Sequence, residues 1–124
     1  MSRFLELIYE GRVFTIWAYK KETGEVPVIE RLEKMAIKYQ VKFGALFSQL
    51  GNEGKIYNET KFKHLTGTDK IFEFKVDNAR ILSFFFSGRR VILTHCFVKK
   101  SSKTPRNEIK LAEKTKKEFE QRSF

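Results

Sequence analysis

The amino-acid sequence predicts an α+β domain, in which an antiparallel sheet packs on two N-terminal helices and a further helix follows at the C-terminus. The chain of 124 residues is long enough for one hydrophobic core, so residues 1–124 are expected to form a single domain. Three segments rich in β-branched and aromatic residues follow one another between residues 70 and 98. Apolar residues recur at helical spacing before and after them. The predicted order of elements is therefore β-α-α-β-β-β-α.

The first predicted strand and two predicted helices occupy the N-terminal half of the chain. Residues 13–19, VFTIWAY, are β-branched and aromatic and are expected to form a strand. Pro27 suits the first turn of a helix, and Gly51 suits the C-cap of the helix that follows. The first helix is predicted from apolar residues at helical spacing, which are Val28, Leu32, Met35, Ala36 and Tyr39. The second helix has an apolar face made of Phe43, Leu46, Phe47 and Leu50.

The next part of the chain is predicted to form a loop and then a meander of three strands. Residues 51–60 are expected to be loop, and residues 61–70 loop or a short strand. The three strands are expected at residues 70–76, 80–86 and 90–98. Turn residues separate them, namely Asp77-Asn78 and Ser87-Gly88-Arg89.

The last predicted element is a helix that begins near residue 104. Thr104 is expected to be its N-cap, with Pro105 in the first turn. Its apolar stripe is thin, so most of this helix is expected to be solvated. The stripe consists of Ile109, Ala112 and Phe119.

Strand pairing predicts which side chains share a face of the sheet. A two-residue turn at Asp77-Asn78 places Lys75 opposite Arg80, and opposed residues share a face. A two-residue turn around Gly88 would add His95 and Lys99 to that face, whereas a three-residue turn would send them to the core, where a buried lysine is costly. The mixed face is thus predicted to hold Glu73, Lys75, Arg80, Leu82, Phe84, Leu93, His95, Phe97 and Lys99. The core face under the helices is predicted to hold Phe72, Phe74, Val76, Ile81, Phe85, Ile92, Cys96 and Val98.

Composition narrows the possible partners and location of the protein. The net charge of +10 favours an anionic partner, which is a nucleic acid, an acidic protein or a membrane surface. Cys96 is the only cysteine, so neither a disulfide within the chain nor a zinc site is expected, and a reducing cytoplasm fits. No apolar stretch is long enough to span a membrane, and the N-terminal segment lacks the pattern of a secretory signal.

The cationic end of the mixed face favours phosphate chemistry that needs no metal. RNA cleavage requires a base, an acid and cations around the transition state. Arg80 can bind two phosphate oxygens, and Lys75 with Lys99 or Lys100 can add charge. Protons could move through His95 or Glu73, or through a lysine whose pKa is lowered by other cations. The alternative is structural: Glu73 pairs with a neighbouring cation, and His95 is a partly buried histidine.

The chain also resembles a known family over nearly its whole length. The resemblance rests on Lys63, Leu65 and Gly67, on the segments 72–75, 80–82 and 93–100, on Thr104-Pro105 and Glu108-Ile109, and on Gly24 with residues 26–28. These residues resemble the RelE/ParE superfamily of type II toxins, and specifically its HigB-like, phage-related branch. Lys75 stands where the family usually has arginine, Ala79 where an aromatic residue is frequent, and Cys96 in place of glycine.

The resemblance implies a single toxin domain of RelE-like fold that cleaves translated mRNA at the ribosome without a metal or other cofactor. It also implies a cognate helix-turn-helix antitoxin as partner, with oligomers formed only through the antitoxin complex. Two open alternatives are a non-catalytic module that binds nucleic acid or protein, and a toxin that acts on DNA gyrase. The implied catalytic residues are Glu73, Lys75, Arg80, His95 and Lys99, and the implied RNA-binding residues are Lys100, Lys103 and Arg106.

Overall fold

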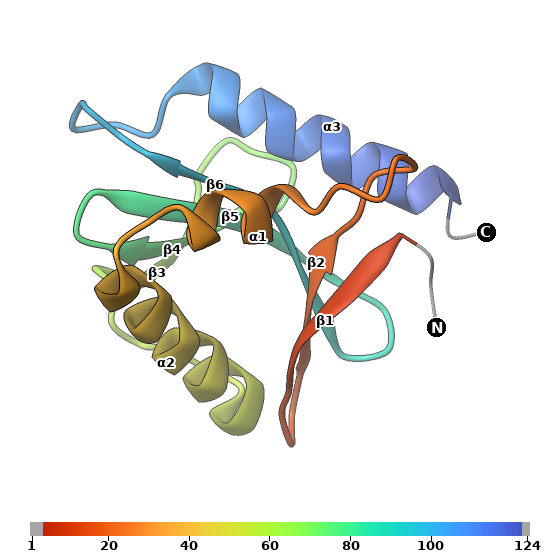
Figure 1. Ribbon diagram of the computed structural model, residues 1–124, viewed down its shortest axis with the longest axis horizontal. Coiled ribbons are helices and arrows are strands. Elements are labelled where there is room, and N and C mark those ends of the chain that lie inside the picture. The colour runs from red at the N-terminus through yellow and green to blue at the C-terminus, as the bar shows by residue number, and fades with distance from the viewer. Residues whose placement is uncertain (1–3, 123–124) are drawn as a thin grey trace.

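A computed structural model describes residues 4–122 of the chain, so both ends of the predicted domain lie outside the described residues. Along the chain, the elements follow the order β-β-α-α-β-β-β-β-α (Figure 1). The predicted order lacks the first strand and the short strand after the second helix. The elements are β1 (Leu5–Glu10), β2 (Thr15–Tyr19), α1 (Pro27–Glu33), α2 (Ile37–Glu53), β3 (Phe62–His64), β4 (Phe72–Val76), β5 (Ala79–Phe86), β6 (Arg90–Val98) and α3 (Arg106–Arg122).

The six strands form one sheet in the order β1-β2-β6-β5-β4-β3. The β4–β5–β6 meander is antiparallel, which confirms the predicted core of the sheet. However, β2 pairs parallel to β6, with Thr15 opposite Arg90 and Ala18 opposite Leu93. The sheet is therefore mixed, and the prediction of a purely antiparallel sheet is wrong.

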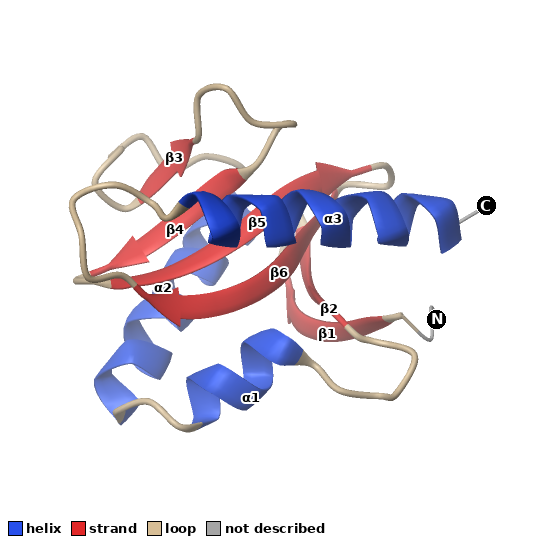
Figure 2. Ribbon diagram, turned by 90° about the horizontal axis from the view of Figure 1, so that it is seen from above, coloured by secondary structure: helices blue, strands red, loops and turns tan. Residues whose placement is uncertain are grey.

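Helices cover both faces of the sheet. Figure 2 shows α3 along one face and α1 and α2 on the other. On the α3 face, Phe84 and Ile92 of the sheet pack with Ala112 and Phe119 of α3 in a second hydrophobic core. The predicted mixed face thus has a core of its own, and α3 is less solvated than its thin stripe suggested. Within residues 4–122, no helix combines the length and the apolar character needed to cross a membrane.

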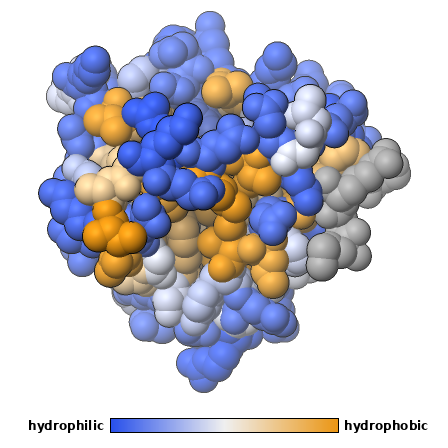
Figure 3. Space-filling model, in the orientation of Figure 1, coloured by the Kyte–Doolittle hydropathy of each residue, from blue (hydrophilic) through white to orange (hydrophobic). Residues whose placement is uncertain are grey.

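The face that carries α1 and α2 has a hydrophobic centre. Orange, hydrophobic side chains gather between α2 and the β1–β2 hairpin, with hydrophilic side chains around them (Figure 3). The core beneath joins residues of α2 to residues of the central strands, such as Phe47 to Phe74, whose ring centroids are 5.2 Å apart. This face is the predicted core face.

The register of β6 differs from the predicted one at two points that offset each other. The β5–β6 turn has three residues, since Phe86 lies opposite Arg90. A β-bulge at Thr94 then restores the alternation, because Leu82 lies opposite His95 while Ser83 lies opposite Leu93. The predicted faces are therefore correct for His95, Cys96 and Phe97 and wrong for two residues before the bulge. Those two are Ile92, which lies under α3, and Leu93, which lies in the α1–α2 core.

The helix boundaries also correct the predicted ones. The first helix ends at Glu33, so Met35 and Ala36 lie between the helices and Tyr39 belongs to α2. The C-cap of α2 is Gly54, which has a positive φ of 79°. Gly51, the predicted C-cap, lies inside α2 instead.

Gly51 marks a close contact between α2 and the β1–β2 hairpin. Its carbonyl oxygen accepts hydrogen bonds from the backbone N–H of Val13 at 2.7 Å and of Phe14 at 2.9 Å. A Cβ atom at Gly11 of the hairpin would lie 2.3 Å from that carbonyl group. The hairpin can therefore sit against α2 only because position 11 has no side chain.

We expect Gly11→Ala to lower the free energy of unfolding by about 1–3 kcal/mol, because backbone atoms must move to relieve the overlap. Gly44→Ala is the matched control, since a Cβ there meets nothing within 4 Å and the position is exposed in α2. That control should raise the free energy of unfolding by up to about 1 kcal/mol. Urea unfolding measures both changes, and equal effects of the two substitutions would contradict the close contact.

Candidate functional site

The candidate site lies on the sheet face that α3 partly covers. Across the strands, Glu73 lies opposite Lys63 on one side and Leu82 on the other, and Leu82 lies opposite His95. One pair further along, Lys75 lies opposite Arg80. Because opposed residues share a face, these residues form two adjacent rows on one surface. The structure thus brings Glu73, Lys75 and Arg80 together, as predicted.

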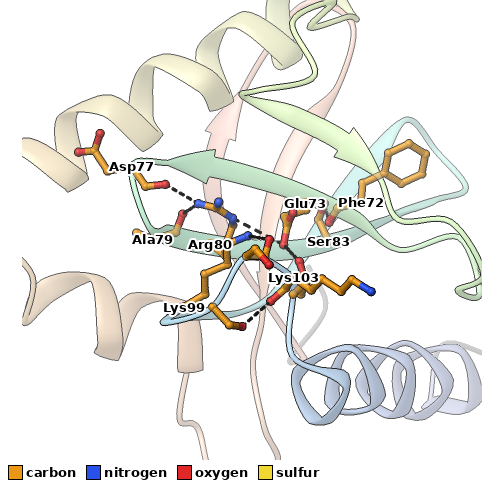
Figure 4. A network of polar contacts seen from close by, with 11 residues as sticks. Phe72, Glu73, Asp77, Ala79, Arg80, Ser83, Lys99 and Lys103 are labelled. Carbon is orange, nitrogen blue, oxygen red and sulfur yellow. Dashed lines mark hydrogen bonds and ion pairs between the residues drawn. The ribbon is translucent and has the colours of Figure 1, made fainter.

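Arg80 is the buried centre of this group. Its side chain is held by the β4–β5 turn, where Nη1 donates hydrogen bonds to the carbonyl oxygens of Asp77 at 2.6 Å and Ala79 at 2.9 Å (Figure 4). Nε lies 3.8 Å from Glu73 Oε2 and has no hydrogen-bond partner among the described residues, although it is buried. Such a donor costs roughly 1–3 kcal/mol when it is left unpaired. An anionic oxygen is the acceptor that best suits it.

Glu73 supplies the negative charge next to Arg80. It is only 2% exposed, and its Oε2 accepts a hydrogen bond of 2.5 Å from the hydroxyl of Thr104. Burial lowers the pKa of Arg80, and the Glu73 carboxylate opposes that change. Glu73 therefore balances the arginine and fixes the segment between β6 and α3 over this end of the sheet.

Thr104 does not act as the predicted N-cap of the last helix. The helix begins at Arg106, and the carbonyl oxygen of Pro105 accepts the first helical hydrogen bonds, from Glu108 at 3.1 Å and Ile109 at 3.2 Å. The predicted helix start is therefore displaced. The Thr104 hydroxyl is turned to Glu73 of the sheet, a contact between distant parts of the chain that local sequence cannot indicate.

Lys75 is the best candidate for a proton acceptor. Burial lowers its pKa, and the positive charges of Lys63, Arg80 and Lys99 lower it further, while Glu73 opposes them. The side chain is half-buried and lines a cavity of about 430 Å³ between α2 and the β3–β4 edge. A lysine of this kind can lose its proton more readily than an exposed one.

His95 is separated from Glu73 by Leu82 in the same row across the sheet, and its ring makes two polar contacts of its own. Its Nε2 lies 3.0 Å from Glu108 Oε1, and its Nδ1 lies 3.0 Å from the hydroxyl of Thr94. Burial lowers the pKa of His95, and the Glu108 carboxylate opposes that change. Nε2 thus links β6 to α3, while Nδ1 contacts the neighbouring Thr94 within β6. These contacts favour the structural alternative for His95.

The predicted RNA-binding residues lie on the segment between β6 and α3 and at the start of that helix. Lys99 Nζ donates a hydrogen bond of 2.7 Å to the carbonyl oxygen of Ser102, so its side chain folds back on this segment. Lys100, Lys103 and Arg106 are exposed. The segment is therefore a basic rim beside the Glu73–Arg80 pair (Figure 4).

Lys63 of β3 completes the cationic group, and Lys61 immediately precedes this strand. Sequence reasoning placed neither lysine at the site. Lys63 lies directly opposite Glu73, and the backbone N–H of Lys75 donates to the carbonyl oxygen of Lys61. Both side chains are exposed. A strand of three residues is too short to show a clear alternation of apolar and polar residues. A short strand was one of the two predictions for residues 61–70.

The chemistry of this group suits an anion more than a metal ion. The charges of Lys63, Arg80 and Lys99 all act on Lys75, and the buried Glu73 carboxylate lies among them. Within residues 4–122, no cluster of three or more histidine, cysteine or acidic side chains is arranged to hold a metal. The group can therefore bind a phosphate and can move a proton at Lys75.

Comparison with known proteins places the chain in a family. The family described as "Phage derived protein Gp49-like (DUF891)" matches residues 30–117, which include the candidate site from Lys61 to Arg106. No protein of curated function matches the chain significantly. The matched range covers more than half of the chain. The chain therefore belongs to the phage-derived Gp49-like family, which is a family of RelE/ParE-like toxins.

Proposed function

We propose that this protein is the HigB-like toxin of a type II toxin–antitoxin system and that it cleaves translated mRNA at the ribosome without a metal. The grouping of Lys63, Lys75, Arg80 and Lys99 beside the buried Glu73 carboxylate carries the proposal, because such a set of cations suits a phosphate. Membership of a toxin family supports the same reading. The proposed partners are a helix-turn-helix antitoxin, mRNA and the ribosome, and the proposed location is the cytoplasm.

The proposed reaction is an attack of a ribose 2′-oxygen on the neighbouring phosphorus, with release of the 5′-oxygen. Lys75 in its neutral form removes the proton of the 2′-hydroxyl. Arg80 donates hydrogen bonds to the phosphate oxygens, and its charge stabilises the transition state. Lys99 provides the proton for the departing 5′-oxygen. Glu73 keeps Arg80 and the Thr104 segment in place and does not itself react.

The proposal is tested by inducible expression of the protein followed by primer extension on cellular mRNAs. We expect growth to stop and new 5′ ends to appear inside translated reading frames. Coexpression of the small helix-turn-helix protein that we expect from a neighbouring reading frame should restore growth. Arrest with DNA damage and intact mRNA would instead indicate a toxin that acts on gyrase. Normal growth would indicate a module that only binds.

A further inference from the structure

The proposed mechanism does not use an aromatic cavity that lies at the edge of the sheet, next to Lys63. The cavity has a volume of about 350 Å³. Its wall includes the rings of Tyr57, His64, Phe72 and Phe85. Tyr57 is 83% exposed and His64 is exposed, while Phe72 and Phe85 are half-buried. Aromatic rings, which are usually buried, here line a cavity that is open to solvent.

Three of these rings, those of His64, Phe72 and Phe85, are packed together through Phe72. Phe72 stacks on the buried ring of Phe62, with centroids 5.5 Å apart and planes inclined by 12°. Its ring also lies 5.0 Å from that of His64 and 4.9 Å from that of Phe85. Because Phe62 belongs to the core and Phe72 and Phe85 pack against it, this part of the cavity wall is in place before any ligand binds. Rigid rings lose little conformational entropy on binding a flat ligand.

The rim of the cavity is basic. Lys55 and Lys63 line it, and Lys55 Nζ lies 5.7 Å from the centroid of the Tyr57 ring. Glu59 is the acidic residue that lines the same cavity. A neighbouring cavity of about 540 Å³ shares His64, Phe72 and Phe85 with it and is also lined by Lys70 and by the ion pair of Lys116 with Glu120. Stacking rings with lysines around them are the combination that binds unpaired nucleic acid.

The position of Lys63 connects this cavity to the candidate site. Lys63 lines the cavity, and its charge also lowers the pKa of Lys75. Successive residues of a strand point to opposite faces, so Lys63 and His64 lie on the two sides of the edge strand β3. An RNA strand that passes around this edge would meet Lys63 with a phosphate and the rings with a base.

We propose that the cavity binds an unpaired nucleobase of the RNA substrate by stacking, while Lys63 binds a phosphate between this base and the bond that is cut. The inference rests on the proposed function, because it takes single-stranded RNA to be the substrate. It assigns a binding role to Tyr57, His64 and Phe72, which the cleavage reaction does not require.

The test is fluorescence anisotropy with a labelled single-stranded 2′-O-methyl oligoribonucleotide, which the proposed reaction cannot cleave, and with an abasic strand of the same length. The variants are Tyr57→Ala and His64→Ala. Ile37→Ala is the matched control, because Ile37 is 71% exposed on α2 and lines neither aromatic cavity. We expect each aromatic variant to bind the base-containing strand roughly 5-fold more weakly, from about 1 kcal/mol of stacking. Binding of the abasic strand should be unchanged, and the control should bind as the wild type does.

The inference is overturned if the wild-type protein binds neither strand or binds both equally, or if the aromatic variants lose affinity for both strands alike. Because the oligonucleotide is uncleavable, the outcome does not depend on catalysis. A protein that stacks the base but cuts no mRNA would support this inference and refute the proposed function. A protein that cuts mRNA while Tyr57→Ala and His64→Ala bind normally would support the proposed function and refute this inference.

Discussion

Replacing Lys75 with methionine is expected to lower the rate of mRNA cleavage by about 10²- to 10⁴-fold, which is the usual contribution of a general base. Lys75→Arg should be similarly inactive, because arginine keeps the positive charge but does not release its proton. The fold should persist in both variants, since Lys75 is half-buried and three nearby cations repel it. Single-turnover cleavage on programmed ribosomes measures the rate.

The pH profile gives a second readout for Lys75. A general base acts in its neutral form, so the rate should rise with pH and level off below the ordinary lysine pKa of 10.5, because the pKa of Lys75 is lowered. The rise should disappear in Lys75→Met. Lys42→Met is the matched control, because Lys42 lines the same cavity from α2 and is not on the sheet face. Full activity of Lys75→Arg would show that Lys75 contributes charge alone.

Replacing Arg80 with methionine is expected to abolish cleavage and also to lower the free energy of unfolding by about 3–5 kcal/mol. The loss of stability follows because Glu73 is 2% exposed and would be left as a buried charge without its partner. A single variant therefore cannot separate folding from function. The double variant Glu73→Met with Arg80→Met can, because replacing both members of a buried pair by apolar residues is often neutral or stabilising.

We expect the double variant to recover most of the stability in urea unfolding and none of the cleavage activity. This result would place Arg80 in the reaction and Glu73 in support of it. Recovery of cleavage together with stability would contradict that assignment, since it would show that the pair only holds the fold. Glu73→Met is the second single variant of this double-mutant cycle. It should also be destabilised, because it leaves the Arg80 guanidinium buried without its carboxylate.

Sequence reasoning succeeded where side-chain alternation and turn chemistry act locally. The pairing of Lys75 with Arg80 follows from a two-residue turn, and the structure has that pairing. It failed for β1, whose sequence LELIYE places Glu6 and Glu10 among apolar residues at the edge of the sheet and contains an irregularity between Leu7 and Tyr9. An edge strand with one buried residue has little pattern to detect.

The last strand was placed correctly at its functional end for an incorrect reason. The expected two-residue turn at Gly88 has three residues, and the bulge at Thr94 shifts the register back. The three-residue turn and the bulge each shift the alternation of side chains by one residue. Only the segment between them was therefore assigned to the wrong face of the sheet. The tertiary contacts of Thr104 with Glu73 and of His95 with Glu108 depend on how α3 lies on the sheet, which no local pattern contains.

The parallel pairing of β2 with β6 has a consequence for the order in which the protein folds. Thr15 is made early during synthesis, yet its partner Arg90 follows only after α1, α2 and three further strands. Such a distant pairing carries a large loop-closure entropy and slows folding. The β1–β2 hairpin can therefore join the sheet only late, and Thr104, which bonds Glu73, is synthesised later than Arg90. Assembly of the basic group thus waits for almost the whole chain, so an interrupted product of translation would lack the complete site.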